Sequence, residues 1–186
     1  MALVERLGAT RLRRALERSE LKTLLRVGRS IDRTVSLVMY DLALRAGEVS
    51  KLRWSDVEND KIKVCRLKDG VDSWLRVDPA TLYAVEAVTK NKKGTMLPWP
   101  QQRVRNWFRY LAKRAGLPLD KRYSHILRRS RATHMLADGA TLQEIQWQLG
   151  HKSVQTTIIY LGITEETQQK ARKVAAIGME ALLSRK

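Results

Sequence analysis

The chain has 186 residues, of which 44% are hydrophobic, so its composition excludes wholesale disorder and suffices for one domain with a packed core. Its 36 Lys and Arg outnumber its 19 Asp and Glu, which gives a formal net charge of +17. Such an excess is typical of a protein with a polyanionic partner, because neutralising phosphates releases counterions. An acidic membrane surface is the alternative partner, although no apolar run approaches the roughly 20 residues that span a bilayer.

The first half of the chain is predicted to contain helices followed by a small sheet. Apolar residues at three-and-four spacing predict helices over residues 10–27, 30–45 and 47–53. Two short strands are expected at 61–67 and 73–77, joined by a Lys-Asp-Gly turn whose glycine can take positive φ. A third strand over 95–97 is expected to end at the prolines that follow.

The second half is predicted to be almost entirely helical. Pro79 suits the first turn of one helix, and Thr141 with Glu144 forms a capping box for another. The remaining helices are expected at 101–115, 124–137, 141–149, 153–160 and 164–183. The expected fold is therefore mainly α with a small antiparallel β-hairpin or three-stranded sheet, in a single domain over residues 1–186.

The cysteine content and the N-terminus bear on the cellular setting. The single cysteine, Cys65, excludes a disulfide framework and a cysteine-ligated metal cluster. It stands in an alternating apolar run, which predicts a buried small side chain. The basic N-terminus contains three glutamates and no small-residue cleavage site, so we do not expect a transit peptide. A reducing, cytoplasmic setting is expected, with nucleoid association if the polyanion is DNA.

Two histidine motifs suit phosphate chemistry but also have structural explanations. His125 and Arg128 lie one turn apart on one predicted helix face, a pattern that a solvated basic face also produces. Gly150 ends a helix and exposes His151, after which a short helix leads to Tyr160. A glycine C-cap and a half-buried core aromatic would explain the same residues.

Two further motifs are equally ambiguous when each is taken alone. Arg45 ends an apolar helix and Glu48 starts the next one, where both charges complement a helix dipole. Lys68 stands at the hairpin tip, where a lysine is usually solvated. The order and spacing of all four motifs therefore carry more information than any one of them.

In order and together, the motifs resemble the catalytic domain of the tyrosine recombinases, the phage integrase family. The Arg-x-x-Glu box of that family is matched by Arg45 and Glu48, and its His-x-Leu-Arg box by His125 to Thr133. Its Leu-Gly-His triplet is matched at 149–151, and its nucleophilic tyrosine, nine positions on, by Tyr160. The resemblance runs from about Leu21 to the last helix and implies the DNA breaking-rejoining enzyme fold.

The chain departs from the family pattern in three places. The Thr-Gly pair that usually precedes the first arginine is Leu42-Ala43 here, and the usual Gly-Lys-Gly hairpin reads Arg-Leu-Lys-Asp-Gly. The general acid could therefore be Lys68 or Lys63. Residues 1–20 are expected to be an N-terminal extension with no N-terminal core-binding domain, as in the similarly short fimbrial phase-variation invertases.

The resemblance implies that the Tyr160 oxygen attacks a DNA phosphodiester. A 3′-phosphotyrosyl link forms and a 5′-hydroxyl leaves, so the bond energy is retained. Nearby positive charge is expected to favour the Tyr160 phenolate, since the ordinary tyrosine pKa is about 10. Arg45 and Arg128 would hold the non-bridging oxygens with bidentate guanidinium forks.

The other site residues receive roles from the same resemblance. His125 would be a general base or hydrogen-bond partner, and Lys68 the general acid for the leaving 5′-oxygen. His151 would hydrogen-bond a non-bridging oxygen, and Glu48 would orient Arg45 or a neighbouring histidine. No metal or other cofactor is expected, because cationic side chains take its place.

Side chains outside the motifs carry simpler expectations. Arg129 and Arg131 would contact the DNA backbone or be solvated. Three tryptophans on predicted helices would pack in the core or at an interface, namely Trp54, Trp107 and Trp147. Two others near the hairpin and a proline bend, Trp74 and Trp99, are candidates for DNA contact.

The implied function is that of a site-specific recombinase of integrase, resolvase or invertase type. The implied partners are double-stranded DNA, further copies of the chain in a synaptic tetramer, and an accessory protein, with no membrane partner. The 164–186 segment is expected either to pack in cis or to dock on a neighbouring protomer. The alternatives are a type IB topoisomerase-like activity and a non-catalytic or partner-dependent DNA-binding regulator with the same fold.

Overall fold

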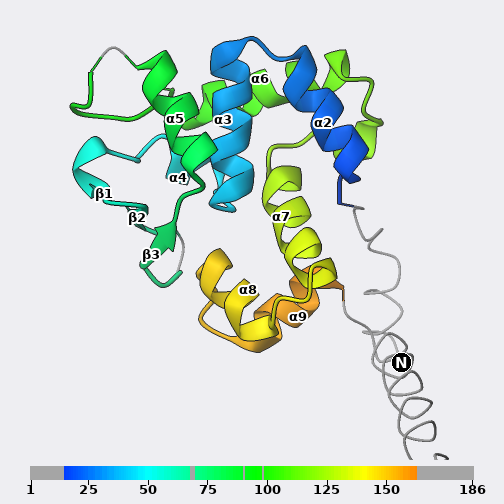
Figure 1. The fold of residues 1–186 in the computed structure, drawn as a ribbon. Helices are drawn as coiled ribbons and strands as arrows, with labels where there is room; N and C mark the ends of the chain where they lie inside the picture. Colours follow the sequence, from blue (N-terminus) through cyan, green and yellow to red (C-terminus); the bar gives the residue numbers. More distant parts are fainter. Residues whose placement is uncertain (1–14, 68–69, 90, 98, 163–186) are drawn as a thin grey trace, which may run out of the picture.

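Helices and one small sheet make up the described part of the chain, which comprises residues 15–67, 70–89, 91–97 and 99–162 of a computed structural model (Figure 1). The helices are α2 (Arg18–Val27), α3 (Ser30–Asp41), α4 (Ala46–Val49), α5 (Pro79–Val88), α6 (Gln101–Arg114), α7 (His125–Ala137), α8 (Leu142–Leu149) and α9 (Val154–Leu161). Two short 3₁₀ helices are η1 (Trp54–Asp56) and η2 (Leu119–Lys121). The predicted helix over 164–183 lies outside the described residues.

The sheet has three antiparallel strands in the order β1 (Val57–Glu58), β2 (Lys61–Val64) and β3 (Ser73–Arg76). Ile62 pairs with Leu75, and both are buried while their sequence neighbours are exposed. The predicted third strand at 95–97 is wrong, because this segment forms only an isolated bridge between Thr95 and Arg53. The third strand is β1, which at two residues is too short to show a strand periodicity.

Alternation along β2 also explains why Cys65 is exposed, contrary to the sequence prediction. Ile62 and Val64 face the core, and side chains alternate between the two faces of a strand. Lys61, Lys63 and Cys65 therefore share the outer face. Cys65 was predicted to be buried, but it lies on the exposed face of this run.

The break between α3 and α4 differs most from the predicted helices. The predicted helix over 30–45 ends at Asp41, and the next begins at Ala46 instead of residue 47 and stops at Val49. Ala43 has a φ of 50° between them, a left-handed conformation that interrupts a helix. Ala43, the second residue of the Leu42-Ala43 pair, therefore adopts a conformation that glycine accepts more readily.

Other local predictions are confirmed. The helix α5 starts at Pro79, and Asp78 caps it by accepting from the Ala80 N–H at 2.8 Å. The capping box of α8 is complete: Thr141 Oγ1 accepts from the Glu144 N–H at 3.2 Å, and the Thr141 N–H donates to Glu144 Oε2 at 2.7 Å. These motifs were predictable because both partners lie within one helical turn.

One large apolar core joins the sheet to α2–α7, with fully buried side chains such as Phe108, Leu111 and Ile126. Leu16 belongs to it, and its backbone N–H donates to Ser130 Oγ on α7 at 2.8 Å. The chain is therefore already packed against the domain at Leu16, four residues before the end of the expected N-terminal extension. Within the described residues no helix has the length and apolarity needed to cross a membrane.

A second, smaller cluster holds α8 and α9 against the C-terminal half of α7 (Figure 1). Its fully buried members are Ala43, Ala132, Ile145 and Leu149, and Tyr160 packs against them. The bend at Ala43 thus contributes directly to the surface on which the last described helices rest.

The tryptophans divide differently from the prediction. Trp54 is buried and Trp107 is half-buried, as expected, whereas Trp147 is 58% exposed, which leaves only the interface of its two expected settings. Trp99, a candidate for DNA contact, is instead buried with its ring centroid 5.3 Å from that of Trp107. Trp74 is 42% exposed on β3, so its contact with DNA stays a prediction.

Candidate active site

Five of the expected site residues converge where the two clusters meet. Arg45 precedes α4 and Glu48 lies on it, Arg128 lies in the first turn of α7, His151 follows α8, and Tyr160 lies near the end of α9. The side chains form a continuous series of contacts that runs from Arg45 through Glu48, Arg128 and His151 to Tyr160. Motifs that are 115 residues apart at their extremes thus form one site.

Glu48 is the buried centre of the cationic part of this site. Its Oε1 accepts from Arg45 Nη1 at 2.8 Å, its Oε2 from the Arg45 N–H at 2.9 Å, and Arg128 Nη1 lies 3.8 Å away. Burial opposes ionisation of Glu48, but the Arg45 N–H and the charges of Arg66, Arg128 and Arg45 outweigh it and lower its pKa. Glu48 is therefore a carboxylate at neutral pH and orients several guanidinium groups.

Arg128 is almost fully buried, with 1% of its surface exposed. Its Nη1 donates to the Ala43 carbonyl and its Nη2 to the Leu149 carbonyl, both at 2.6 Å. Burial and the charge of Arg45 lower its pKa to about 10, so it stays protonated at neutral pH. Two backbone carbonyls thus fix the guanidinium, one at the bend after α3 and one at the end of α8.

Arg66 is a site residue that the sequence motifs did not reveal. Its fully buried side chain donates from Nη1 to Glu48 Oε2 at 3.1 Å and from Nη2 to the Gln148 carbonyl. Burial lowers its pKa, and the Glu48 carboxylate opposes that shift. Arg66 therefore joins the hairpin to the end of α8 through the Gln148 carbonyl, and to α4 through the same carboxylate that holds Arg45.

Two glycines leave the room that Arg66 needs. A Cβ atom at Gly70 would lie 2.5 Å from Arg66 Cβ, and one at Gly150 would lie 2.6 Å from Arg66 Nε. The Val71 N–H also donates to the Gly150 carbonyl at 3.1 Å. Gly150 has a φ of 64° as the C-cap of α8, so it serves both the helix end and this close approach. The sequence signal for Arg66 was this pair of glycines, which acquires meaning only in three dimensions.

His151 is held in place from both ring nitrogens. Its Nε2 lies 3.3 Å from Arg128 Nη2, and its Nδ1 lies 3.0 Å from Thr157 Oγ1. Desolvation, followed by the charges of Arg128, Arg45 and Arg66, lowers its pKa to about 4. His151 is therefore a neutral imidazole at neutral pH.

Tyr160 is positioned beside His151 but is not activated in this structure. The two ring centroids are 5.5 Å apart with an edge-to-face geometry, and the Arg129 guanidinium lies 5.7 Å from the tyrosine ring. The hydroxyl is buried and has no hydrogen-bond partner in the described part of the chain. Burial raises the pKa of Tyr160, and the charges of Arg128 and Arg129 only partly oppose it. Positive charge therefore does favour the phenolate, but burial outweighs it.

The remaining expected residues are placed less closely. His125 is the first residue of α7, and its side chain is exposed. Desolvation of its ring by the surrounding protein, followed by the charges of Arg128 and Arg45, lowers its pKa. Lys68 lies outside the described residues, so its position is not part of the site as described. Lys63, the alternative, is exposed on β2. Arg131 is partly exposed, lies 3.6 Å from Asp41 and stacks over Tyr40, so its contact with DNA stays a prediction.

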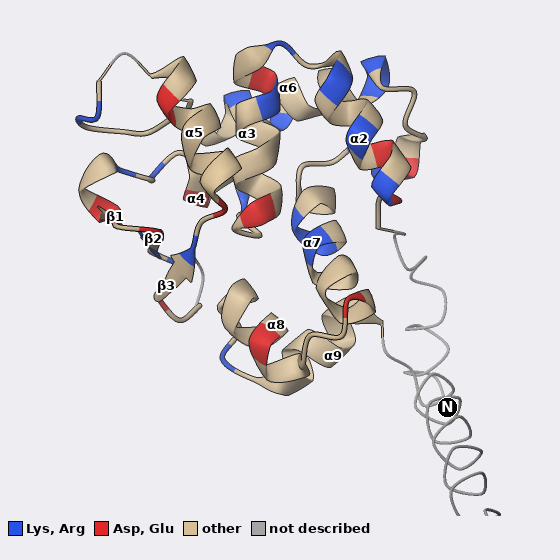
Figure 2. Cartoon of the chain, in the orientation of Figure 1, with Lys and Arg blue, Asp and Glu red and all other residues tan. Residues whose placement is uncertain are grey.

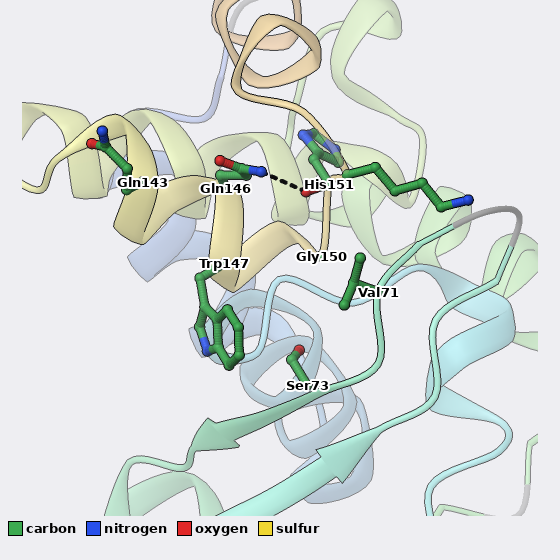
Figure 3. A pocket seen from close by; sticks show the side chains of 8 residues that line it. Val71, Ser73, Gln143, Gln146, Trp147, Gly150 and His151 are labelled. Carbon is green, nitrogen blue, oxygen red and sulfur yellow. Dashed lines mark hydrogen bonds between the residues drawn. The ribbon is translucent and has the colours of Figure 1, made fainter.

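A pocket of about 300 Å³ adjoins the site between the hairpin and α8 (Figure 3). Val71 and Ser73 line it from the hairpin, and Trp147 and His151 from the other side. Gln146 Nε2 donates to the His151 carbonyl at 3.0 Å, which fixes the backbone at the pocket rim. Among the described residues, no group of three His, Cys, Asp or Glu side chains has a geometry that would hold a metal ion.

Lysines and arginines gather on α2, α6 and α7 (Figure 2). On α6 the exposed residues include Arg103, Arg105 and Arg109. Arg105 contributes to the positive potential at His125. Part of the net positive charge of the chain thus lies on an exposed basic surface near the buried arginines.

The fold and the arginine-tyrosine site define the catalytic-domain class of the tyrosine recombinases. The description "Phage integrase family" matches residues 14–167, and the chain belongs to that family. Tyrosine recombinase XerA of Thermococcus onnurineus is 30% identical over 94% of this chain and 66% of the relative. XerA of Thermococcus kodakarensis is 32% identical over 89% of this chain and 64% of the relative. The chain thus spans just under two thirds of the length of these relatives.

Solved structures show the same fold at lower identity. A XerA recombinase matches with a TM-score of 0.71 at 23% identity, over 87% of this chain and 63% of the other. A lambda integrase dimer bound to a COC′ core site matches with a TM-score of 0.69 at 19% identity, over 79% of this chain and 47% of the other. The Tn1549 transposon integrase in complex with transposon right end DNA matches with a TM-score of 0.72 at 15% identity, over 88% of this chain and 66% of the other.

Proposed function

We propose that the chain cleaves and rejoins double-stranded DNA as a site-specific recombinase, through a 3′-phosphotyrosyl link at Tyr160. The observation that carries this proposal is the convergence of Arg45, Arg128 and Tyr160 around Glu48 and His151. Two fixed cations next to a tyrosine hydroxyl suit phosphoryl transfer, because the transition state gathers negative charge on its non-bridging oxygens. Membership of the phage integrase family supports the same reaction.

Each site residue would have a distinct part in the reaction. Arg45 is partly exposed and Arg128 is buried. Together they would hold a non-bridging oxygen, Arg45 from the solvent side and Arg128 from the protein interior. His151 would hydrogen-bond the same phosphate. His125, with a lowered pKa, would accept a proton as a neutral base, and Lys68 would protonate the leaving 5′-oxygen. No metal or other cofactor enters this scheme.

Tyr160 would need a change of surroundings before it reacts. Its hydroxyl is buried without a partner, and its pKa is raised in the free chain. A phosphate bound between Arg45 and Arg128 would supply the missing polar contact. The same observation favours a second candidate, a regulator or enzyme that is active only with a partner.

The proposed assembly is a synaptic tetramer on DNA. The lambda integrase structure above is a dimer bound to its core site, which supports a multimeric DNA complex for this chain. Residues 164–186 would dock on a neighbouring protomer and couple assembly to cleavage. An accessory protein and association with the nucleoid in the cytoplasm belong to the same proposal.

Covalent trapping tests the proposal. The protein is incubated with nicked duplexes tiled from the DNA that flanks its own gene, then denatured and examined for a protein–DNA adduct. An adduct that is absent from Tyr160→Phe but present in the matched Tyr110→Phe variant, whose tyrosine is exposed on α6, supports the recombinase. Absence of an adduct despite measured DNA binding favours the regulator.

Strand exchange separates the recombinase from a type IB topoisomerase-like enzyme. Holliday-junction formation between two trapped sites is expected of the recombinase, whereas supercoil relaxation without exchange would support the topoisomerase. A truncation after Ile163 that still forms synapses and cleaves would contradict docking of the 164–186 segment.

A further inference from the structure

Thr157 is a buried residue of α9 that the family motifs did not single out. It is 0% exposed, lies one turn before Tyr160, and its hydroxyl oxygen is 3.0 Å from His151 Nδ1. His151 is therefore clamped between a hydroxyl on the helix of the nucleophile and the Arg128 guanidinium. This arrangement fixes where the imidazole carries its proton.

The proton of His151 lies on Nδ1 in the free chain. An arginine N–H can only donate, so the contact between Arg128 Nη2 and His151 Nε2 requires Nε2 to be the acceptor. A neutral imidazole with an unprotonated Nε2 carries its hydrogen on Nδ1, which then donates to Thr157 Oγ1. The low pKa of His151 supports the neutral ring.

This tautomer cannot perform the role that was proposed for His151. A non-bridging phosphate oxygen is an acceptor only, so His151 must present a hydrogen on Nε2 to bind it. Arg128 occupies that nitrogen in the free chain. A tautomer exchange is therefore required if a phosphate comes between Arg128 and His151.

A threonine hydroxyl is suited to such an exchange because it can accept from Nδ1 or donate to it. When it accepts, its own hydrogen has no acceptor among the described residues, since the His151 contact is the hydroxyl's hydrogen bond there. When it donates to Nδ1, that hydrogen is used. The exchanged state therefore satisfies one more buried polar hydrogen.

We propose that Thr157 is a positioning residue that allows His151 to exchange from the Nδ1–H to the Nε2–H tautomer when a DNA phosphate binds. The ring loses one proton at Nδ1 and gains one at Nε2 by exchange with water, so the imidazole stays neutral. The Thr157 hydroxyl keeps its proton and rotates from acceptor to donor. The assignment rests on the proposed function for the identity of the phosphate ligand.

The charged groups around His151 favour exchange over protonation. Arg128, Arg45 and Arg66 disfavour an imidazolium, and Glu48 alone among the four favours it. The three cations therefore keep the ring neutral in both states. Because Thr157 and Tyr160 share α9, the hydrogen bond also fixes the distance between the nucleophile and the phosphate-binding histidine.

The tautomer is measured directly by ¹⁵N NMR of protein labelled at its histidines, with a His151→Gln sample to assign the signal. The free wild-type chain is expected to show Nδ1–H at His151. Tyr160→Phe protein, which binds a duplex without cleaving it, is expected to show Nε2–H. Nε2–H in the free chain, or no change on binding a duplex that contains a trapped site, would overturn the proposal.

Substitutions separate positioning from packing. Thr157→Val keeps the shape without the hydroxyl. The free variant should keep Nδ1–H at His151, because Arg128 still donates to Nε2. Combined with Tyr160→Phe and bound to the duplex, it should show less Nε2–H than Tyr160→Phe alone, and single-turnover cleavage by Thr157→Val should fall at least about tenfold with DNA affinity unchanged. Thr157→Ser should restore both, and Thr156→Val at the exposed neighbour should change neither. Equal Nε2–H signals in the DNA-bound Tyr160→Phe chains with and without Thr157→Val would refute the role of the hydroxyl.

The two kinds of readout distinguish the two proposals. If no phosphotyrosyl adduct forms but a bound duplex still shifts His151 to Nε2–H in a Thr157-dependent way, the recombinase proposal fails and the tautomer exchange stands without a catalytic role. If the adduct forms at the wild-type rate in Thr157→Val, the recombinase proposal stands and the positioning role fails.

Discussion

The two sides of the site are held by different forces. Arg45 and Glu48 rest on the large core that joins the sheet to α2–α7, where apolar burial is extensive. His151 and Tyr160 rest on α8 and α9, whose apolar cluster in the described part of the chain has only four fully buried residues, two of them alanines, with four partly buried residues packed against them. Because apolar stabilisation scales with buried area, the side that carries the proposed nucleophile is the weaker one.

Hydrogen bonds to the end of α8 compensate for this small cluster. Arg128 donates to the Leu149 carbonyl, Arg66 to the Gln148 carbonyl, and Gln148 Nε2 to the Asp41 carbonyl at 2.9 Å. The same arginines also converge on Glu48. The groups proposed to bind phosphate thus attach the helices that carry the nucleophile, so phosphate binding and the placement of α8 and α9 are coupled.

Removal of Glu48 should have the largest effect on this comparison. Glu48→Ala leaves three buried or half-buried guanidinium groups without their carboxylate, and breaking a buried ion pair costs about 3–5 kcal/mol. Urea unfolding measures the loss. Glu58→Ala, at an exposed glutamate of β1, is the control and should change the free energy of unfolding by less than about 0.5 kcal/mol. Equal losses would show that the buried cluster is not a centre of stability.

A pH series should show a smaller effect from the same carboxylate. The pKa of Glu48 is lowered on folding from its ordinary value of 4.5, so its stabilisation is fully present above that value. It is lost as the pH falls through the lower, folded pKa. Glu48→Gln should lack this component, so the stability difference between wild type and variant should shrink in acid. A difference that stays constant from pH 7 to pH 3 would contradict the assignment.

Matched isoleucine truncations should separate the two regions. Ile126→Val in the large core and Ile145→Val in the small cluster remove the same methyl group from fully buried positions, each at a cost of about 0.5–1.5 kcal/mol. Native-state hydrogen exchange should show faster exchange confined to α8 and α9 for Ile145→Val. Ile126→Val should instead accelerate the slowest amides of the whole domain. Identical exchange patterns would mean that the two clusters unfold as one unit.

The smallest expected effect is a gain in stability at the bend. Ala43 has a φ of 50°, so Ala43→Gly should relieve strain and stabilise the chain by up to about 1 kcal/mol in thermal unfolding. Ala112→Gly, inside α6, is the control and should destabilise the chain by about 0.5–1 kcal/mol or more. A lower melting temperature for Ala43→Gly would show that the methyl group contributes more to the small cluster than the strain costs.

The parts of the fold that depend on local sequence were predictable. Pro79 and the Thr141 capping box gave helix starts, and the spacing of Arg45, Arg128 and Tyr160 gave residues that the structure brings together. Their roles in DNA cleavage stay predictions. The two-residue strand β1 and the bend at Ala43 were missed because neither has a periodicity or a glycine to mark it.

Features that depend on distant partners could not be predicted from sequence. Arg66 is buried because Glu48 and the Gln148 carbonyl, 18 and 82 residues away, meet it in space. Thr157 gains a role only when the turn after α8 brings His151 back to α9. Tyr160 was expected to be activated by positive charge, but its burial depends on the packing of α9. In each case the decisive quantity is solvent exposure, which the motifs do not encode.

The shared carboxylate also sets a charge stoichiometry. Arg45, Arg66 and Arg128 carry three positive charges, Glu48 neutralises one of them, and the neutral His151 adds none. A bound phosphodiester would neutralise a second charge, and the incoming phenolate would neutralise the third at the pentacoordinate state. Counting these groups alone, the site has a net charge of zero at the transition state but remains positively charged with intact DNA bound. Charge alone would therefore make the site bind the transition state more tightly than intact DNA, in addition to any effect of shape.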